Sequence, residues 1–408
     1  MATIREREVA LADKEELISG SEAIAVACKM ADVDVITAYP IRPYDTVMQY
    51  VAKLVANGEM DCEYIVAESE HSQFEMVKHA SAVGARVFVG SSGVGWMYAF
   101  EALTVTPALR IPMVAMVGNR ALDDPGAFGV EHNDALAVRD LGWMLVWVDT
   151  AQEALDTALL AWRIAEDRRI LLPCAIGCDG AFLTHSQTLV KIPAQEKVDE
   201  FLPPYNRGDL TLHPDNPITV APQANEDWVM EIRKQNDAAM RRAPGVIKEA
   251  YADLERIFGR RYGDNPFFEE YETDDADVVL LGMGTMSMPV KVAIRKMRKE
   301  GKKVGFVRLR WFRPFPAEAL QQSLSRFKAV GVIDRDYSVG SPYFSGVVAN
   351  EVRTALYSAE KRPPVVGFIC GLGGREVTVP NVREMTDMTF RAASGERLTD
   401  TYWIGLRE

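Results

Sequence analysis

The chain has 408 residues, enough for two or three domains with substantial cores. Its composition, 48% hydrophobic and 25% charged, is typical of a globular protein, and no apolar run reaches the roughly 18 residues of a membrane span. The net charge of −12 argues against a partner such as nucleic acid or an anionic membrane. Because the charged start, MATIREREVALADKEE, is unlike a signal peptide, we expect a cytoplasmic location.

The five cysteines and five histidines form no metal-binding pattern. Cys174 and Cys178 are four residues apart but lack a second pair, and no HExxH motif occurs. We therefore predict that this chain holds no metal, and that any iron–sulfur cluster used with it lies on another chain.

The N-terminal part of the chain alternates between β-rich and helical segments, with polar or glycine-rich loops after the strands. This alternation is typical of a parallel α/β sheet. Thr150 and Glu153 have the spacing of a capping box at the start of one helix. Strands are predicted at 33–38, 64–67, 85–89, 111–117 and 170–176, with helices at 21–31, 46–57, up to 78, from 96 and from 150.

A second α/β unit follows a proline-rich, polar segment that contains one long helix at 225–258. The predicted domains are 1–191, a connector at 192–272, and 273–408. In the last domain we expect strands at 276–281, 303–309, 329–334 and 365–369, and helices at 286–299, 317–327 and 344–358.

The turn after the first predicted strand carries Tyr39 and Arg42 between two prolines, Pro40 and Pro43. The prolines prevent continuation as a central strand or a helix, so the turn should be stiff. An arginine held in this way could bind a carboxylate as a fixed fork. The alternative is a solvated arginine in a polar turn.

Further polar residues stand at the ends of other predicted strands, where α/β sheets bind ligands. Glu70 could share a proton with a ligand nitrogen, or it could be an acid that favours a helix N-terminus. The GSSG loop at 90–93 could let a ligand approach the backbone. Arg120 could be a second guanidinium beside Arg42, or it could pair with Asp123 or Asp124.

Several motifs together resemble the α subunit of the 2-oxoacid:acceptor oxidoreductases, the pyruvate:ferredoxin oxidoreductase family. They occur in order over about 21–374: YPIRP at 39–43, ESEH at 68–71, GSSGVG at 90–95, NRALDDPGAFG at 119–129, EHND at 131–134 and RLRWFRPFP at 308–316. The resemblance implies an N-terminal thiamine diphosphate pyrimidine-binding domain and a C-terminal transketolase-like α/β domain. The GDG motif for the diphosphate and Mg²⁺ is absent, which fits a family in which a β subunit binds that end of the cofactor.

The resemblance also implies roles for individual residues. Glu70 matches the glutamate that hydrogen-bonds the aminopyrimidine of thiamine diphosphate, driving the imino tautomer that generates the ylid for attack on the 2-oxo carbon. Arg120 matches the arginine that holds the substrate carboxylate. The remaining cofactor-binding residues implied by the motifs are Tyr39, Pro40, Ser92 and Gly93.

One departure bears on the substrate. Pyruvate-type members have threonine where this chain has Arg42; with Asp123, this resembles the oxalate oxidoreductase and phenylglyoxylate dehydrogenase branch. A second guanidinium suits the oxalate dianion, whereas four nearby side chains could surround a phenyl ring or simply pack in the core. These four are Trp96, Met97, Phe100 and Phe128. We predict oxidative decarboxylation of phenylglyoxylate to benzoyl-CoA; oxalate oxidation without CoA is the alternative, and pyruvate the third candidate.

The resemblance further implies partner chains. A β subunit would bind the diphosphate with Mg²⁺, ferredoxin-like γ and δ subunits would carry iron–sulfur clusters, and ferredoxin, or NAD through an FAD subunit, would accept electrons. Coenzyme A would be the cosubstrate. A non-catalytic assembly subunit is a different possibility, which the presence of Glu70 and Arg120 disfavours. The missing diphosphate motif disfavours a free-standing transketolase-type enzyme.

Overall fold

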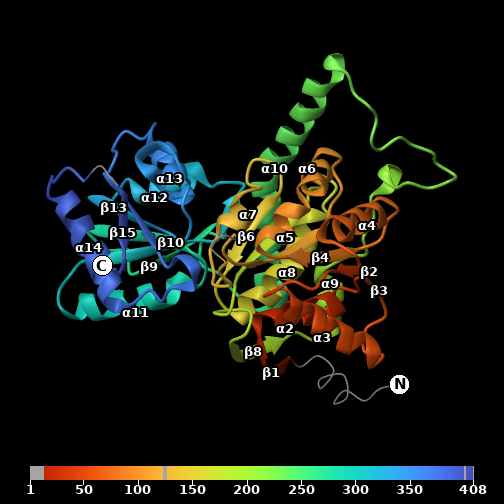
Figure 1. The fold of residues 1–408 in the computed structure, drawn as a ribbon, viewed down its shortest axis with the longest axis horizontal. Helices are drawn as coiled ribbons and strands as arrows, with labels where there is room; N and C mark the ends of the chain where they lie inside the picture. The colour runs from red at the N-terminus through yellow and green to blue at the C-terminus, as the bar shows by residue number, and fades with distance from the viewer. Residues whose placement is uncertain (1–12, 123–125, 399–400, 408) are drawn as a thin grey trace.

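The computed structural model describes residues 13–122, 126–398 and 401–407. Two open sheets, each covered by helices, lie beside each other in Figure 1: the first in red to yellow, the second in cyan to blue. Among the helices of these residues, none combines the length and apolar character needed to cross a membrane. The predicted mixed α/β fold with parallel sheets is therefore confirmed.

The first sheet has seven strands in the order β12-β6-β7-β5-β4-β2-β3. Its strands pair in parallel except β12, which runs antiparallel to β6. The strands are β2 (Val35–Ala38), β3 (Glu63–Val66), β4 (Val87–Ser91), β5 (Val114–Asn119), β6 (Met144–Val148), β7 (Cys174–Asp179) and β12 (Trp311–Arg313). The four central strands β4 to β7 are buried along their whole length, as a parallel sheet covered on both faces requires.

Helices cover this sheet, with α2 packed on α3 and α8, and α4 packed on α6. The helices are α2 (Gly20–Met30), α3 (Asp45–Ala56), α4 (Glu70–Ala82), α5 (Gly93–Tyr98), α6 (Phe100–Ala108), α7 (Asn133–Leu136), α8 (Ala151–Ala165) and α9 (Gln195–Phe201). Their starts are specified locally: Ser69 caps α4 and Thr150 caps α8 through their side-chain oxygens.

A small antiparallel pair, β1 (Lys14–Ser19) with β8 (Gln187–Ile192), brings the two ends of the first unit together. After α9 the chain makes a wide loop, and α10 (Glu226–Phe258) then returns to the body. Figure 1 shows that the beginning of α10 projects away from both sheets. This long helix begins one residue after the predicted position and ends where it was predicted.

The second sheet has six strands in the order β15-β14-β13-β10-β11-β9, parallel except for β9. Its strands are β9 (Phe268–Tyr271), β10 (Val278–Met283), β11 (Val304–Leu309), β13 (Ala329–Asp334), β14 (Val365–Cys370) and β15 (Thr401–Ile404). Its helices are α11 (Ser287–Lys299), α12 (Ala317–Leu324), α13 (Val347–Leu356) and α14 (Val379–Ala393). Single 3-10 turns occur at η1 (Gly208–Leu210), η2 (Gly284–Met286), η3 (Pro342–Phe344) and η4 (Leu372–Gly374).

Some local expectations were wrong. The strand predicted at 170–176 begins only at Cys174, after Pro173, which has no N–H to donate to a ladder. The helix expected from 96 is two helices, α5 and α6, that meet at Ala99. Six strands and three helices were not predicted: β1, β6, β8, β9, β12 and β15, and α7, α9 and α14. The domain boundaries stay a prediction, although β12 joins the first sheet directly after β11 has joined the second.

Candidate active site

The predicted site residues meet at the carboxyl ends of three neighbouring strands. Because β2, β4 and β5 are adjacent in the first sheet, the loops that follow them lie together, and α4 begins at the same edge. Tyr39 and Pro40 follow β2, Ser92 and Gly93 follow β4, Arg120 follows β5, and Glu70 is the first residue of α4.

The Glu70 side chain is buried, with 8% of its surface exposed. Its carboxylate lies over Gly95, where a Cβ atom would collide with Oε1 and would come within 2.8 Å of Ser91 Oγ. Across the described residues we find no hydrogen bond or ion pair to the Glu70 carboxylate. The absence of a side chain at Gly95 therefore leaves room for a buried carboxylate whose acceptor oxygens have no internal donor.

The loop after β4 is anchored by Asp134. Gly93 has a φ of +52°, which glycine adopts without strain, and its N–H donates to Asp134 Oδ2 at 3.0 Å. The same oxygen accepts the N–H of Arg120, also at 3.0 Å. Burial raises the pKa of Asp134, and the donors around it, including the Asn119 amide, act in the opposite direction. One buried carboxylate thus joins the loops after β4 and β5.

Three hydroxyl groups beside these loops are buried and have no hydrogen-bond partner in the structure: those of Tyr44, Ser91 and Ser92. The Tyr44 ring lies on Gly90, where any side chain would clash with it, and burial raises the pKa of its phenol. Buried polar groups in proteins are normally satisfied, so orphaned hydroxyls next to a lone carboxylate are typical of a site that binds a polar ligand or ordered water.

Arg120 is buried and held from several sides. Its Nη1 donates to the carbonyl oxygen of Arg42 at 3.1 Å, and its guanidinium lies 5.2 Å from the centre of the Phe128 ring. Phe128 itself is 71% exposed. The structure therefore brings Arg120 and Phe128 together, a cation–π arrangement at the end of β5.

The Arg42 side chain points outward. It is 81% exposed, and its only described ion-pair contact is with Asp45, at 3.9 Å. The expected fixed fork is therefore not formed within this chain, because the prolines order the backbone of the turn and not the side chain. Asp123 lies outside the described residues, and so does Asp124.

The aromatic residues expected around a phenyl ring do not form one group. Trp96 is fully buried and makes edge-on contacts with Phe74 and Trp143, with ring centres 5.3 and 5.5 Å apart. It is a core residue, so of the two alternatives left open by the sequence, core packing holds for Trp96. Met97 packs against the same core, whereas Phe100 is exposed like Phe128.

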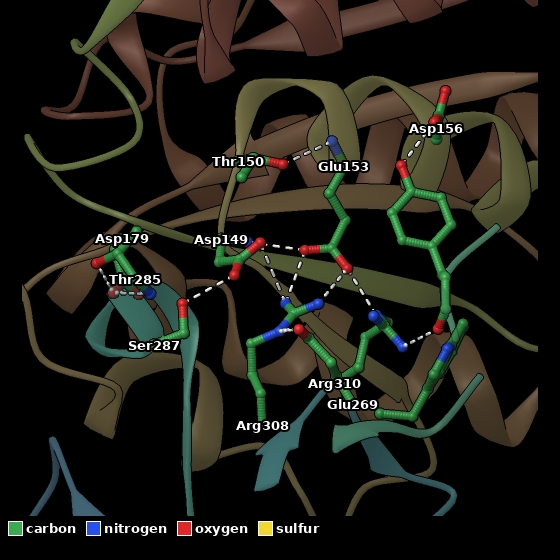
Figure 2. A network of polar contacts seen from close by, with 12 residues as sticks. Asp149, Thr150, Glu153, Asp156, Asp179, Glu269, Thr285, Ser287, Arg308 and Arg310 are labelled. Carbon is green, nitrogen blue, oxygen red and sulfur yellow. Dashed lines mark hydrogen bonds and ion pairs between the residues drawn. The ribbon is translucent and has the colours of Figure 1, made fainter. Parts of the chain in front are cut away.

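A second polar cluster, missed in the sequence, centres on Glu153 near the start of α8 (Figure 2). Arg308 donates from Nη1 and Nη2 to its two oxygens, both at 2.7 Å, and Arg310 Nε donates to Oε1 at 2.6 Å. Burial opposes ionisation, but the two guanidinium groups hold the pKa of Glu153 well below its usual range.

Glu153 also corrects the capping-box prediction, because its Oε2 accepts the N–H of Asp149 at 2.9 Å and not that of Thr150. Burial, together with the charge of Glu153, raises the pKa of Asp149 to about 7. Ser287 Oγ donates to Asp149 Oδ2 at 2.8 Å, as Figure 2 shows. Since α8 belongs to the first unit and Ser287 and Arg308 to the second, this cluster joins the two. The alternating arginines of RLR at 308–310 were the one signal for it in the sequence.

The end of β7 makes another link between the units. Asp179 Oδ1 lies 2.8 Å from His132 Nε2, while Oδ2 accepts from the Thr285 hydroxyl at 2.5 Å and from Arg335 Nη1 at 2.9 Å. Burial opposes the charge of Asp179, and His132 and Arg335 nevertheless hold its pKa well below the usual range.

The loop that carries Phe128 is held by the second unit. The Gly373 N–H donates to Glu131 Oε1 at 2.9 Å, and a Cβ atom on Gly129 would clash with the backbone of Gly373. The two backbones can approach this closely because Gly129 has no side chain, and a Cβ atom on the adjacent Gly374 would likewise lie only 2.8 Å from the Gly129 Cα. In the part of the chain that the structure describes, no group of three or more His, Cys, Asp or Glu side chains is placed to hold a metal ion.

Comparison with known families shows which family this chain belongs to. Residues 26–252 match the thiamine diphosphate-binding family of pyruvate flavodoxin/ferredoxin oxidoreductases, and residues 276–382 match core domain II of pyruvate:ferredoxin oxidoreductase. The chain belongs to this family. The oxidoreductase family and the thiamine-dependent enzyme class expected from the motifs are thereby confirmed.

Relatives of this oxidoreductase chain align over nearly its whole length. Pyruvate synthase subunit PorA of Methanocaldococcus jannaschii is 40% identical, covering 96% of this chain and 98% of that protein. The α subunit of NADH-dependent phenylglyoxylate dehydrogenase from Aromatoleum evansii is 33% identical, covering 100% and 99%. Ketoisovalerate oxidoreductase subunit VorA of Pyrococcus abyssi is 36% identical, covering 96% and 98%.

Solved structures support the fold of the oxidoreductase chain. The 2-oxoglutarate:ferredoxin oxidoreductase of Magnetococcus marinus superposes with a TM-score of 0.68 at 17% identity, over 93% of this chain and 65% of that one. A split-gene transketolase, described as an inactive β4 tetramer, gives a TM-score of 0.54 at 14% identity, over 93% and 99%.

Proposed function

We propose that this chain is the catalytic α subunit of a hetero-oligomeric oxidoreductase that converts phenylglyoxylate and coenzyme A to benzoyl-CoA, CO₂, one proton and two electrons. The observation that carries the aromatic assignment is the Phe128 ring over the Arg120 guanidinium. A guanidinium suits the carboxylate of a 2-oxo acid, and a neighbouring aromatic ring suits a phenyl substituent.

The residues at the ends of β2, β4 and β5 fit a polar aromatic ring. Glu70 offers a buried carboxylate without an internal donor, which the missing side chain at Gly95 makes room for, and the Ser92 hydroxyl has no partner. Thiamine diphosphate, when bound, supplies the electron sink for loss of CO₂. The part of Glu70 is to hold a proton between its carboxylate and the ring nitrogen that faces it. The buried position excludes water, which would otherwise compete for that hydrogen bond.

Arg120 and its neighbours position the substrate. Asp134 fixes the backbone of Arg120, and the Arg42 carbonyl fixes its guanidinium, so the side chain is oriented before a substrate arrives. Orientation of this kind lowers the entropic cost of reaching the reactive geometry. Arg42 itself contributes its backbone oxygen here, and its exposed side chain is left for contacts outside this chain.

We propose that the site is completed by partner subunits. Val66, Tyr98 and Phe128 are exposed apolar residues. Val66 ends β3 and Phe128 lies in the loop after β5, both at the site edge of the sheet, and Tyr98 ends the short helix α5, which begins there. A β subunit that binds the diphosphate and Mg²⁺ would cover them. Iron–sulfur clusters on γ and δ subunits would take the electrons, passing them to ferredoxin, or to NAD through FAD.

Pyruvate is the second candidate substrate. The 40% identity to a pyruvate synthase subunit favours it, and so does the loss of Trp96 from the expected aromatic pocket. Oxalate loses support, because the Arg42 guanidinium is turned away from Arg120 toward solvent and Asp45.

The test is steady-state turnover by the purified native complex on phenylglyoxylate, pyruvate and oxalate, with and without coenzyme A. Coenzyme A-dependent turnover of phenylglyoxylate is expected. In Phe128→Ala the KM for phenylglyoxylate should rise about tenfold, while Phe100→Ala, which removes another exposed ring, should leave it unchanged. Turnover of pyruvate alone would overturn the aromatic assignment, and no turnover of any 2-oxo acid would overturn the catalytic role.

A further inference from the structure

A cavity of about 510 Å³ lies away from the Glu70 site, between the end of α6, the segment 206–224 and the first half of α10. Its walls are mostly apolar, with Leu109, Ile218 and Ile232 among them. Three arginines, Arg110, Arg207 and Arg233, are the charged residues of its lining, and no aspartate or glutamate contributes to it. Because the chain has a net charge of −12, its overall composition does not account for three arginines in one cavity without an aspartate or glutamate.

Arg207 is the most deeply buried of the three, with 2% of its surface exposed. Its Nη1 donates to the Ala82 carbonyl at 3.2 Å and its Nη2 approaches the Arg110 carbonyl at 3.5 Å, whereas Nε has no partner. Burial lowers the pKa of Arg207. No carboxylate of the described residues forms an ion pair with it, so its charge is met only by backbone dipoles.

Arg110, the second arginine of the lining, has a strained backbone and lies near other positive charges. Its backbone has a φ of +55°, a left-handed conformation that residues other than glycine and asparagine rarely adopt. Its Nε donates to the Ile170 carbonyl at 2.7 Å. Burial lowers the pKa of its guanidinium, and the neighbouring positive charges of Arg242 and Arg207 act in the same direction. Like charges are thus gathered around a strained residue.

From these contacts we infer that the cavity is an anion-binding site for a small molecule that carries a phosphate or carboxylate group on an apolar body. An arginine stays charged at any physiological pH, so it cannot relieve its burial by losing a proton. A buried, unpaired charge is costly, and a bound anion would offset that cost. Asn236 Oδ1 is buried at the same wall without a partner.

The site is separate from the proposed catalytic residues, since none of Glu70, Arg120 and Phe128 lines the cavity. Variants at the cavity can therefore be examined without removing the reaction. Arg233 is the best residue to change, because it is exposed and makes no described ion pair. Arg241, on the same helix but outside the lining, is the matched control for loss of one positive charge.

The experiment is equilibrium dialysis of the purified complex, saturated with thiamine diphosphate, against radiolabelled inorganic phosphate and, separately, benzoate. We expect saturable binding of at least one probe, with phosphate preferred if the natural ligand is a phosphate ester and benzoate preferred if it is a carboxylate. Arg233→Gln should weaken binding about tenfold, as expected for loss of one charged hydrogen bond. Arg241→Gln should not, and kcat should be unchanged in both variants.

Absence of saturable binding of both probes would overturn the inference, and so would equal weakening in Arg233→Gln and Arg241→Gln. Arg110→Gln provides a second measurement, with thermal unfolding checked first. It should weaken binding at least as much as Arg233→Gln if the half-buried Arg110 guanidinium helps to hold the anion. A carboxylate of a partner subunit seated on Arg207 in a structure of the complex would also overturn the inference, because the missing counter-charge would then come from another protein.

Discussion

Glu70 and Glu153 occupy nearly the same local position, yet the protein uses them differently. Each is buried in the first turn of a helix that follows a strand of the first sheet, α4 in one case and α8 in the other. Glu153 accepts hydrogen bonds from Arg308 and Arg310, whereas no donor among the described residues reaches the Glu70 carboxylate. One carboxylate is fully paired inside the fold, and the other is left to be paired by something that binds.

This difference separates the parts of the molecule that stabilise the fold from the part that binds ligand. In the cluster around Glu153, carboxylates of the first unit, Asp149 and Glu153, pair with Arg308 in β11 and with Arg310, so the cluster resists opening of the junction between the sheets. At the Glu70 site, the lone carboxylate and the orphaned hydroxyls of Ser91 and Ser92 are locally unfavourable. Such local exceptions to polar satisfaction are expected at functional sites.

The largest expected effect is on catalysis by Glu70→Gln. The amide cannot hold the proton in the way that the carboxylate does, so kcat should fall by about 10²–10⁴-fold. The thermal unfolding midpoint and subunit assembly should be unchanged, because the described contacts give the carboxylate no ion pair to lose. Steady-state kinetics and size-exclusion chromatography would check this. Full activity in the variant would remove Glu70 from the mechanism and remove the contrast with Glu153.

Glu153→Gln should show the opposite pattern. Loss of the carboxylate leaves Arg310 buried without an ion-pair partner among the described residues and leaves Arg308 with only Asp149 and Glu269. This should cost about 3–5 kcal/mol of unfolding free energy. Urea unfolding would measure it. Glu396→Gln, which breaks an exposed pair with Arg391, is the control and should leave the unfolding midpoint in place. Equal midpoints for the two variants would show that the buried cluster does not stabilise the junction.

Gly129→Ala tests whether the second unit shapes the Phe128 loop. The new Cβ atom would clash with Gly373, and overpacking of this kind typically costs about 1–3 kcal/mol. If the loop shifts as a result, kcat/KM should fall about tenfold. Gly126→Ala, in the same loop, meets nothing within 4 Å and is the matched control. Identical kinetics for both variants would mean that the contact between the glycines does not position the substrate loop.

The smallest expected effect is the pH dependence of stability from Asp149. Burial raises its pKa from 3.8 in the unfolded chain to about 7, so the folded protein binds the extra proton between these values. The stability contribution is complete below about pH 4 and is lost as the pH rises toward 7, with a slope of at most about 1.4 kcal/mol per pH unit.

Asp149→Asn should therefore flatten the fall in unfolding free energy between about pH 4 and 7, as measured by urea unfolding at several pH values. Asp215→Asn, at an exposed position, should keep the slope of the parent protein. A steeper slope in Asp149→Asn would contradict the assigned direction of the pKa shift.

Much of the fold was predictable because its elements are specified locally. β13 occupies the predicted range, and α10 differs by one residue, since a run of small and aliphatic residues or a long amphipathic pattern suffices to mark such elements. The three-residue strand β12 was not predictable, because it exists only through pairing with β6, far away in the chain. The sequence could not decide between pocket and core for Trp96 for a similar reason: its neighbours Phe74 and Trp143 come from other elements.

The sequence by itself determined that Glu70, Ser92, Gly93 and Arg120 follow strands, and parallel strands bring such residues to one edge. Only the tertiary structure decided that, among the described residues, Glu153 is paired with arginines inside the fold and Glu70 is not. Arg308 lies 155 positions from Glu153, and no local rule connects them. The outward turn of Arg42 and the closeness of Gly129 to Gly373 were likewise decided by packing. The physical reason is common to all of these: local patterns set backbone conformation, whereas charge pairing and close approach depend on segments that meet only when the chain has folded.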